Sequence, residues 1–433
     1  MNSEDISKAI NDIDDEIIKS ANEMRKPKSR KNIWLRYGAS AAAIAIIALA
    51  GIKAFDVSKP PIDEPNDFPI NSGTENPGFI SGTEPEYGGY ENLPILHYEE
   101  AEGMAYGWEG YIAHDVSELD SGNPWNENMV FKTLPVFENK SFHETGIALP
   151  GIGEEAMLEK LDFSAKALDA EINEIIKETL GETTSGIDFP ADTVTLTYTY
   201  TENCCIDVSS SGQIVARFGK EENRFREGLE LPENYNFTHS GTTDGEAFEI
   251  LSYVYQNYSD FIGVEEPTFI SWADYTFDGN QNRSYSIYDF SGDELSDMLN
   301  FAFNKVDVAP NDEGKLMLIR INDYLSCAEK IGEYPIISPE EAKELLLGGN
   351  YITTVPYEIP GEEYIAGVEL LYRSRTSEKI WMPYYRFLIE IPGTLDNTKA
   401  GNLDGFKEFG AYYVPAVEME YITGLPLWNG NFN

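Results

Sequence analysis

The stretch Tyr385-Arg-Phe-Leu-Ile-Glu-Ile391 decides the fold class of the C-terminal part of the chain. Its odd-numbered residues are aromatic or branched, and Arg386, Leu388 and Glu390 alternate with them. This period of two predicts a β-strand with one face buried in a core. The runs Ile365–Tyr372 and Ala411–Val417 have a similar composition and predict two partner strands.

A helix is predicted just before these strands. Ser338 is a suitable N-cap, Pro339 fits the first helical position, and Glu340 and Glu341 favour the positive end of the helix dipole. Gly348-Gly349 supplies a stop. We therefore expect a helix packed on one face of an antiparallel sheet.

The same order of elements recurs upstream. Helical spacing covers Glu154–Leu180 and Asp244–Phe261. Alternation or turn chemistry predicts strands at Val194–Tyr200, Cys205–Val208, Gln213–Phe218, Thr268–Phe277, Ser284–Phe290, Phe301–Val308 and Lys315–Ile321. The predicted fold class is α+β, an outer part of repeated helix plus antiparallel-sheet units preceded by one transmembrane helix. The predicted outer units are 96–240, 241–335 and 336–433.

The transmembrane helix is predicted at 37–55. Tyr37–Ile52 holds 16 residues without a charge, and Lys53 can snorkel to the interface. Six basic residues and no acidic one lie in 25–36, so positive-inside asymmetry places the N-terminus in the cytoplasm and the remainder outside the cell membrane. A cleaved signal peptide is the competing interpretation, since Ala48-Leu-Ala50 has small residues at cleavage spacing. Residues 56–95 are rich in Pro, Gly, Asn and Ser and predict a flexible stalk.

The net charge of −44 divides unevenly about this segment. Residues 1–36 have eight basic and seven acidic side chains, a net of +1, so the rest carries −45. So acidic a body repels nucleic acid, which we exclude as a partner.

The cytoplasmic leader, residues 1–36, contains one apolar stripe. Ile6, Ile10, Ile13 and Ile17 recur at spacings of four, three and four, as on one face of an amphipathic helix. A lone short helix cannot bury this stripe, so we expect a partner protein, a second copy or the membrane surface to cover it. A marginal helix without a partner is the alternative.

Two segments resemble known families. The leader, Ile6-x-x-Ala-Ile-x-x-Ile-Asp-x-Glu-Ile-Ile18, followed by basic residues and one span, resembles Firmicutes membrane-anchored anti-sigma-factor-like proteins, although the His/Cys motif of zinc-containing anti-sigma domains is absent. That resemblance implies a sigma factor as cytoplasmic partner. The C-terminal unit is similar to a PepSY-type or YycI-type module in Ile337-Ser-Pro-Glu-Glu-Ala342, Met382-Pro-Tyr-Tyr-Arg-Phe387 and Gly410-Ala-Tyr-Tyr-Val-Pro-Ala416. The likeness to YycI implies a membrane-tethered regulator with a noncatalytic outer domain.

The sequence contains no strong catalytic or metal-binding signature. The four histidines are isolated, and no HExxH, GxSxG, P-loop or GxGxxG motif occurs. Cys204 and Cys205 are adjacent and Cys327 is remote, which is not a disulfide framework, although one bridge from Cys327 to the pair remains open. We expect no metal, no cofactor and no enzymatic activity.

The aromatic residues of the C-terminal unit offer a candidate ligand groove at Trp381, Tyr385 and Tyr413. Strand alternation makes core packing the more ordinary role for such residues. The predicted function is a membrane-tethered noncatalytic regulator, whose leader binds a signalling partner and whose outer domains sense or bind an envelope component. The alternative is an anchored extracellular peptide- or glycan-binding protein.

Overall fold

The structure is a computed structural model that describes residues 92–99, 111–114, 121–142, 151–172, 174–179, 194–200, 204–219, 228–232, 235–275, 280–393 and 406–428. Pro85–Asn433 form one compact unit. The leader, the predicted span and nearly all of the stalk lie outside the described residues. The described part contains four α-helices, α4 (Gly153–Ala167), α5 (Asp244–Ile262), α6 (Glu294–Phe303) and α7 (Pro339–Leu347).

Most of the regular structure is β-strand. The strands are β1 (Leu96–His97), β2 (Tyr111–His114), β3 (Thr133–Asn139), β4 (Glu174–Thr179), β5 (Val194–Tyr200), β6 (Cys204–Ser209), β7 (Ile214–Phe218), β8 (Pro267–Tyr275), β9 (Gln281–Asp289), β10 (Val306–Pro310), β11 (Leu316–Ile321), β12 (Ala328–Pro335), β13 (Ile365–Tyr372), β14 (Ile380–Trp381), β15 (Pro383–Glu390), β16 (Lys407–Pro415) and β17 (Ile422–Thr423). The same part of the chain also contains three short 3₁₀ helices, η5 (Tyr324–Cys327), η6 (Glu362–Tyr364) and η7 (Met419–Tyr421).

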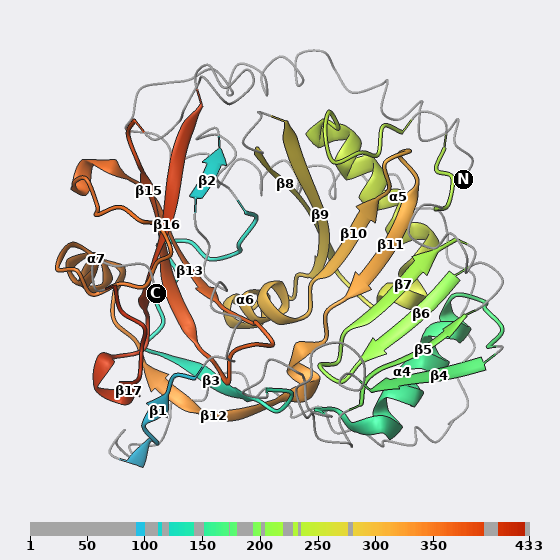
Figure 1. Ribbon diagram of the computed structural model, residues 1–433, viewed down its shortest axis with the longest axis horizontal. Helices are drawn as coiled ribbons and strands as arrows, with labels where there is room; N and C mark the ends of the chain where they lie inside the picture. Colours follow the sequence, from blue (N-terminus) through green and yellow to red (C-terminus); the bar gives the residue numbers. More distant parts are fainter. Residues whose placement is uncertain are drawn as a thin grey trace, which may run out of the picture. The chain divides into compact units, whose positions relative to one another are not determined.

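One antiparallel sheet joins strands from all three predicted units. Its order is β13-β15-β16-β2-β8-β9-β10-β11-β7-β6-β5-β4. The short strand β2 connects the two halves, and its pairing with β8 is the single match of Ala113 with Tyr275. In Figure 1, β4 to β11 fan out on one side and β13, β15 and β16 stand on the other, with α6 between them. The described residues also form a three-stranded sheet, β12-β3-β14, and the parallel pair β1-β17.

The predicted fold class is therefore wrong. Repeated α+β units would each close their own sheet, but their strands instead continue one another's hydrogen-bonded ladder, and the result is a mostly β protein with four helices in its described part. The reason is that a short local sheet leaves edge N–H and C=O groups unpaired, and lateral pairing with the next unit satisfies them. No described helix is both long and apolar enough to span a bilayer, and 37–55 lies outside the described residues. The unit boundaries stay a prediction.

The predictions of single helices and strands agree with the structure more often than the prediction of how they assemble. The helix that starts after Ser338 is confirmed, with both hydrogen bonds of a capping box between Ser338 and Glu341. The prediction of one helix over Glu154–Leu180 is wrong, because α4 ends at Ala167 and the remaining segment forms β4 against β5. Helix α6 was missed: Asp293 caps it by accepting a hydrogen bond from Ser296 N–H.

Three apolar cores fill the layers. The first lies between the β6–β11 part of the sheet and helices α4 and α5. The second packs α6 and α7 on one face of β13, β15 and β16, and it contains Tyr385, Phe387, Ile389 and Ile391 as predicted. The other face of β15 is also covered, because Tyr384 and Leu388 lie in a third core with β3, β12 and β14. The predicted one-sided burial of this strand is therefore wrong.

The edge strand β13 is partly protected by a side chain. Asn123 Nδ2 donates to the carbonyl oxygen of Leu370 at 3.0 Å, and Ser121 Oγ donates to Glu369 Oε1 at 3.2 Å. An amide that occupies an edge carbonyl competes with pairing by another chain. The segment before β3 therefore packs on the second core through Trp125 and also covers part of the free edge of β13.

We expect Gly212→Ala to destabilise the protein. Gly212 has φ +90°, and a Cβ there would lie 2.2 Å from the carbonyl oxygen of Asp323. Strain and clash together should cost about 2–4 kcal/mol of unfolding free energy, measured by urea denaturation.

Gly263→Ala is the matched control for backbone strain alone. Its φ is +69° and nothing lies within 4 Å of the added Cβ. Its expected cost is about 1–2 kcal/mol. Equal losses in the two variants would show that the hairpin tip at Gly212 does not press on the Asp323 backbone.

Candidate functional site

A polar cluster crosses three neighbouring strands on the face of the sheet that points away from α4 and α5. Asp307 of β10 lies opposite Arg320 of β11 and opposite Ser286 of β9. Directly opposed residues share a face, whereas the intervening Val306 and Val308 belong to the first core. The strand register therefore brings an acid, a cation and a hydroxyl together.

The carboxylate of Asp307 is held by two neutral donors. Ser286 Oγ donates to Oδ1 at 2.9 Å, and Asn322 Nδ2 donates to Oδ2 at 3.1 Å. Asn322 Nδ2 also lies 2.8 Å from the carbonyl oxygen of Lys305. Asp307 is thus fixed in place by hydrogen bonds from β9 and from the residue that follows β11.

A second pair of bonds ties the cluster to the β6–β7 hairpin. Gln213 Nε2 lies 2.9 Å both from Asn322 Oδ1 and from the hydroxyl oxygen of Tyr324. Burial raises the pKa of Tyr324, so this hydroxyl stays neutral at ordinary pH. We call these seven residues the Asp307 cluster: Gln213, Ser286, Lys305, Asp307, Arg320, Asn322 and Tyr324.

Two cations stand beside the single carboxylate. Arg320 Nη1 lies 4.0 Å from Asp307 Oδ2, and the two side chains are 39% and 30% exposed. Lys305 Nζ lies 4.7 Å from the centre of the Phe301 ring. Burial lowers the pKa of Lys305, Asp307 opposes that shift, and the positive charge of Arg386 adds to it.

Arg217 of β7 extends the same charged face. Burial lowers the pKa of Arg217 first, Cys205 opposes the shift, and Arg320 lowers the pKa further by like-charge repulsion. Arg217 is paired with Asp207 on β6. The cluster therefore combines donors, one engaged acid and neighbouring cations that repel one another, an arrangement suited to binding rather than to proton transfer.

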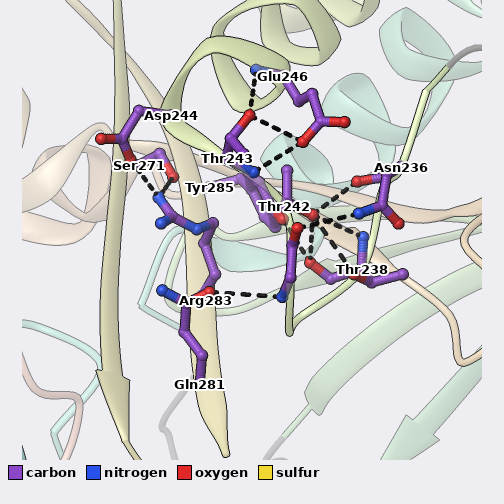
Figure 2. Close-up of polar contacts among 11 residues, drawn as sticks. Asn236, Thr238, Thr242, Thr243, Asp244, Glu246, Ser271, Gln281, Arg283 and Tyr285 are labelled. Carbon is purple, nitrogen blue, oxygen red and sulfur yellow. Dashed lines mark hydrogen bonds and ion pairs between the residues drawn. The ribbon is translucent and has the colours of Figure 1, made fainter.

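A separate polar network surrounds the N-terminus of α5, and we interpret it as structural (Figure 2). Thr243 and Glu246 form a capping box, and the Thr243 backbone N–H lowers the pKa of Glu246. Arg283 Nη1 donates to Asp244 Oδ1 at 2.8 Å and to Ser271 Oγ at 2.7 Å. These bonds fix α5 on β8 and β9.

Thr242 holds the loop before that helix. Its hydroxyl donates to the carbonyl oxygen of Asn236 at 2.6 Å, and the backbone N–H of Thr238 donates to the hydroxyl oxygen at 3.1 Å. Tyr285 OH donates to the carbonyl oxygen of Thr238 (Figure 2). These groups hydrogen-bond one another, so they hold the loop in place and are already occupied.

The three predicted groove residues are buried. Trp381, Tyr385 and Tyr413 are 0%, 2% and 2% exposed. Trp381 Nε1 donates to Arg375 O at 2.7 Å, and Tyr385 OH donates to Ile337 O at 2.9 Å. Trp381 and Tyr385 lie in the second core and Tyr413 in the third. A ligand would have to displace this packing, so their ligand-binding role stays a prediction.

An interior ion pair adjoins Tyr413. Arg373 lies with its guanidinium carbon 5.3 Å from the centre of that ring. The side chains of Arg373 and Glu378 are 6% and 0% exposed, and Arg373 Nη2 lies 2.6 Å from Glu378 Oε1. Burial opposes the charge of Arg373, but the Glu378 carboxylate more than offsets it and raises the pKa of Arg373. The pair fixes the loop between β13 and β14.

Cys327 lies where the halves of the unit meet. All three cysteines are free and buried. Cys327 Sγ lies 3.2 Å from the carbonyl oxygen of Ser211, on the β6–β7 hairpin, and 3.2 Å from that of Tyr324. Burial raises the pKa of the Cys327 thiol to about 11, so the thiol stays protonated at neutral pH.

The predicted leader residues Ile6, Ile10, Ile13 and Ile17 lie outside the described residues. Within the described ranges, no group of three or more His, Cys, Asp or Glu is placed to hold a metal ion. The sequence reasoning missed the Asp307 cluster. Its only local signal is the alternation of Lys305 and Asp307 with Val306 and Val308, and the partners on β9 and β11 are visible only in the paired sheet.

Comparisons with known proteins assign no family. No family model matches the chain, and no curated protein matches it. One solved structure, of an uncharacterized protein from Eubacterium rectale, is similar at a TM-score of 0.28 and 11% identity over 66% of this chain and 84% of that one. A likeness at this level does not establish a shared fold.

We expect Glu378→Gln to cost about 3–5 kcal/mol of unfolding free energy, because it leaves the Arg373 charge buried without its counter-charge. The control is Glu362→Gln, which breaks the surface pair with Lys343, where the side chains are 62% and 39% exposed. That change should cost about 0–1 kcal/mol. Urea denaturation measures both, and a small loss for Glu378→Gln would show that solvent reaches Arg373.

Stability should fall at alkaline pH through Cys327. The folded pKa of about 11 lies above the ordinary value of 9.0, so folding favours the protonated thiol. Its contribution is fully present below pH 9 and is lost as pH rises through 11. The unfolding free energy of wild type should therefore drop between these values by roughly 2–3 kcal/mol more than that of Cys327→Ser. Parallel pH profiles would contradict this prediction.

Proposed function

We propose that the chain is a membrane-tethered noncatalytic regulator. Its leader binds a cytoplasmic signalling protein such as a sigma factor, and its outer unit senses or binds an envelope component. The observation that carries the proposal is the division of the sequence at 37–52, with six basic residues directly before the apolar segment and a net charge of −45 after residue 36. The basic residues on one side of the apolar segment are what orients a single span.

The described unit supports a binding role. Its interior charges are engaged in fixing the fold, as Arg373 is with Glu378 and Arg283 is with Asp244. The thiol of Cys327 is kept protonated at neutral pH by burial. The Asp307 cluster presents cations and hydrogen-bond donors. Its one carboxylate, that of Asp307, already accepts two hydrogen bonds. These properties suit recognition at a fixed surface.

The alternative is an anchored extracellular peptide- or glycan-binding protein in which the leader binds nothing. It shares the span and the acidic outer unit with the proposal. The two therefore separate at the leader, where the regulator needs the isoleucine stripe and the alternative does not.

We expect the double substitution Ile10→Asp and Ile13→Asp to abolish capture of the cytoplasmic partner. Two carboxylates on the stripe cannot be desolvated against an apolar partner surface. Cross-linking in intact cells of the native host, followed by purification of the full-length protein, should recover a sigma factor or kinase with wild type and at least about tenfold less with the variant.

Asn11→Asp is the matched control, since it adds a negative charge to the same predicted helix away from the stripe. Neighbouring residues are about 100° apart around a helix axis, so Asn11 points away from Ile10 and Ile13. It should recover the partner like wild type. Recovery of the same proteins by wild type and the stripe variant, or no cytoplasmic signalling protein with either, would exclude the regulator and leave the anchored binding protein.

A further inference from the structure

The Asp307 cluster carries more positive than negative charge in a chain of the opposite balance. The whole chain has 31 basic and 75 acidic residues. The cluster has Lys305 and Arg320 against the one carboxylate of Asp307. Lys305 and Asp307 stand two residues apart on the same face of one chain segment, and Arg320 is opposite Asp307. The two cations are thus diagonal neighbours, which long side chains can bridge.

Asp307 does not fully neutralise these cations. Its two oxygens already accept hydrogen bonds from Ser286 and Asn322. Arg320 Nη1 remains 4.0 Å from Oδ2, beyond hydrogen-bond distance. Among the described residues, no carboxylate forms an ion pair with Lys305, whose ammonium instead faces the Phe301 ring.

Arg320 also has an unused donor. Its Nε is buried and has no hydrogen-bond acceptor among the described residues, although the side chain as a whole is 39% exposed. A buried N–H without an acceptor is costly. A guanidinium presents Nε–H and Nη–H as a planar fork that matches the two oxygens of a carboxylate or a phosphate. Because the side chain is 39% exposed, a rotation of the guanidinium would bring Nε–H and an Nη–H within reach of a small oxyanion from solvent.

Neighbouring strands add to the positive potential. Arg386 lowers the pKa of Lys305, and Arg320 lowers that of Arg217, so these cations destabilise one another. Each of the two outer arginines has its own acid, Glu369 for Arg386 and Asp207 for Arg217. Lys305 and Arg320 share the single carboxylate of Asp307, so one positive charge of this pair remains uncompensated.

We propose that the Asp307 cluster binds a small oxyanion, a carboxylate or a phosphate, between Arg320 and Lys305. Arg320 contacts two of its oxygens through the guanidinium fork, and Lys305 supplies a second positive charge. Ser286 and Asn322 hold Asp307 in place, the charge of Asp307 attracts Arg320, and none of the three contacts the anion. This inference rests on the cluster alone and does not depend on the proposed tether or its cytoplasmic partner.

The test is calorimetric titration of the full-length protein with inorganic phosphate and, separately, with acetate, each at an ionic strength held constant with chloride. We expect saturable binding of at least one of the two. Arg320→Gln and Lys305→Met should each weaken it at least about tenfold, because each removes a charged hydrogen-bonding partner. Phosphate alone, acetate alone or both identifies the preferred oxyanion.

Lys315→Gln is the matched control. It removes a positive charge from the same β10–β11 hairpin, where Lys315 is paired with Glu230 and Glu313 away from the cluster. It should bind like wild type. Arg320→Lys keeps the charge and loses the fork, so it should bind less tightly than wild type, and it replaces Arg320→Gln if that variant does not fold.

Two results would overturn the proposal. One is the absence of saturable binding of either probe to wild type. The other is equal binding by wild type, Arg320→Lys and Lys305→Met, which would assign the anion to another place on the molecule. Circular dichroism of each variant establishes that the comparison is made between folded proteins.

Discussion

Backbone hydrogen bonding between strands from distant parts of the chain is the constraint on which this structure depends. Short antiparallel segments such as β10–β11 and β15–β16 cannot leave their edges unpaired in a buried setting. Each local group of strands therefore continues into the next, and twelve strands share one order. The arrangement of the cores follows from this sheet, because α4 and α5 pack on one half of it and α6 and α7 pack on the other.

The two halves need more than the sheet to hold together, because β2 meets β8 through a single pair of residues. The β6–β7 hairpin supplies a second connection: Gly212 packs on the backbone of Asp323, Ser211 lies against Cys327, and Gln213 bonds Tyr324. Tyr324 in turn lies 6.1 Å from Trp381 between ring centres. The Asp307 cluster is at this connection, so its geometry depends on how the halves meet.

Buried and exposed positions of this protein differ in the charged residues that they hold. Two of the arginines are used in the interior, since the side chains of Arg283 and Arg373 are each 6% exposed. Most of the acids that pair with surface lysines are well exposed, such as Glu362 at 62% and Glu313 at 68%. Long guanidinium groups can satisfy several acceptors in a buried site, which suits arginine to this role. An acidic protein can thereby keep a local positive site.

The sequence by itself determined the local elements whose signals lie within a few residues. The capping box at Ser338, the alternation of Tyr385 to Ile391 and the length of α5 all follow from backbone sterics and side-chain period, and each is observed. The extent of α4 was overestimated because Ile172, Ile175 and Ile176 recur at helical spacing, whereas pairing with β5 makes Glu174–Thr179 a strand.

Only the tertiary structure decided the fold class and the site. Contacts between residues far apart in the chain decide which strand edges pair and why both faces of β15 are buried. Such contacts also bring Asp307 to Arg320, Ser286 and Asn322. The local pattern of Lys305 to Val308 specifies one buried face and one polar face. The partners of that polar face come from the register of neighbouring strands, which hydrogen bonding fixes only when the sheet assembles.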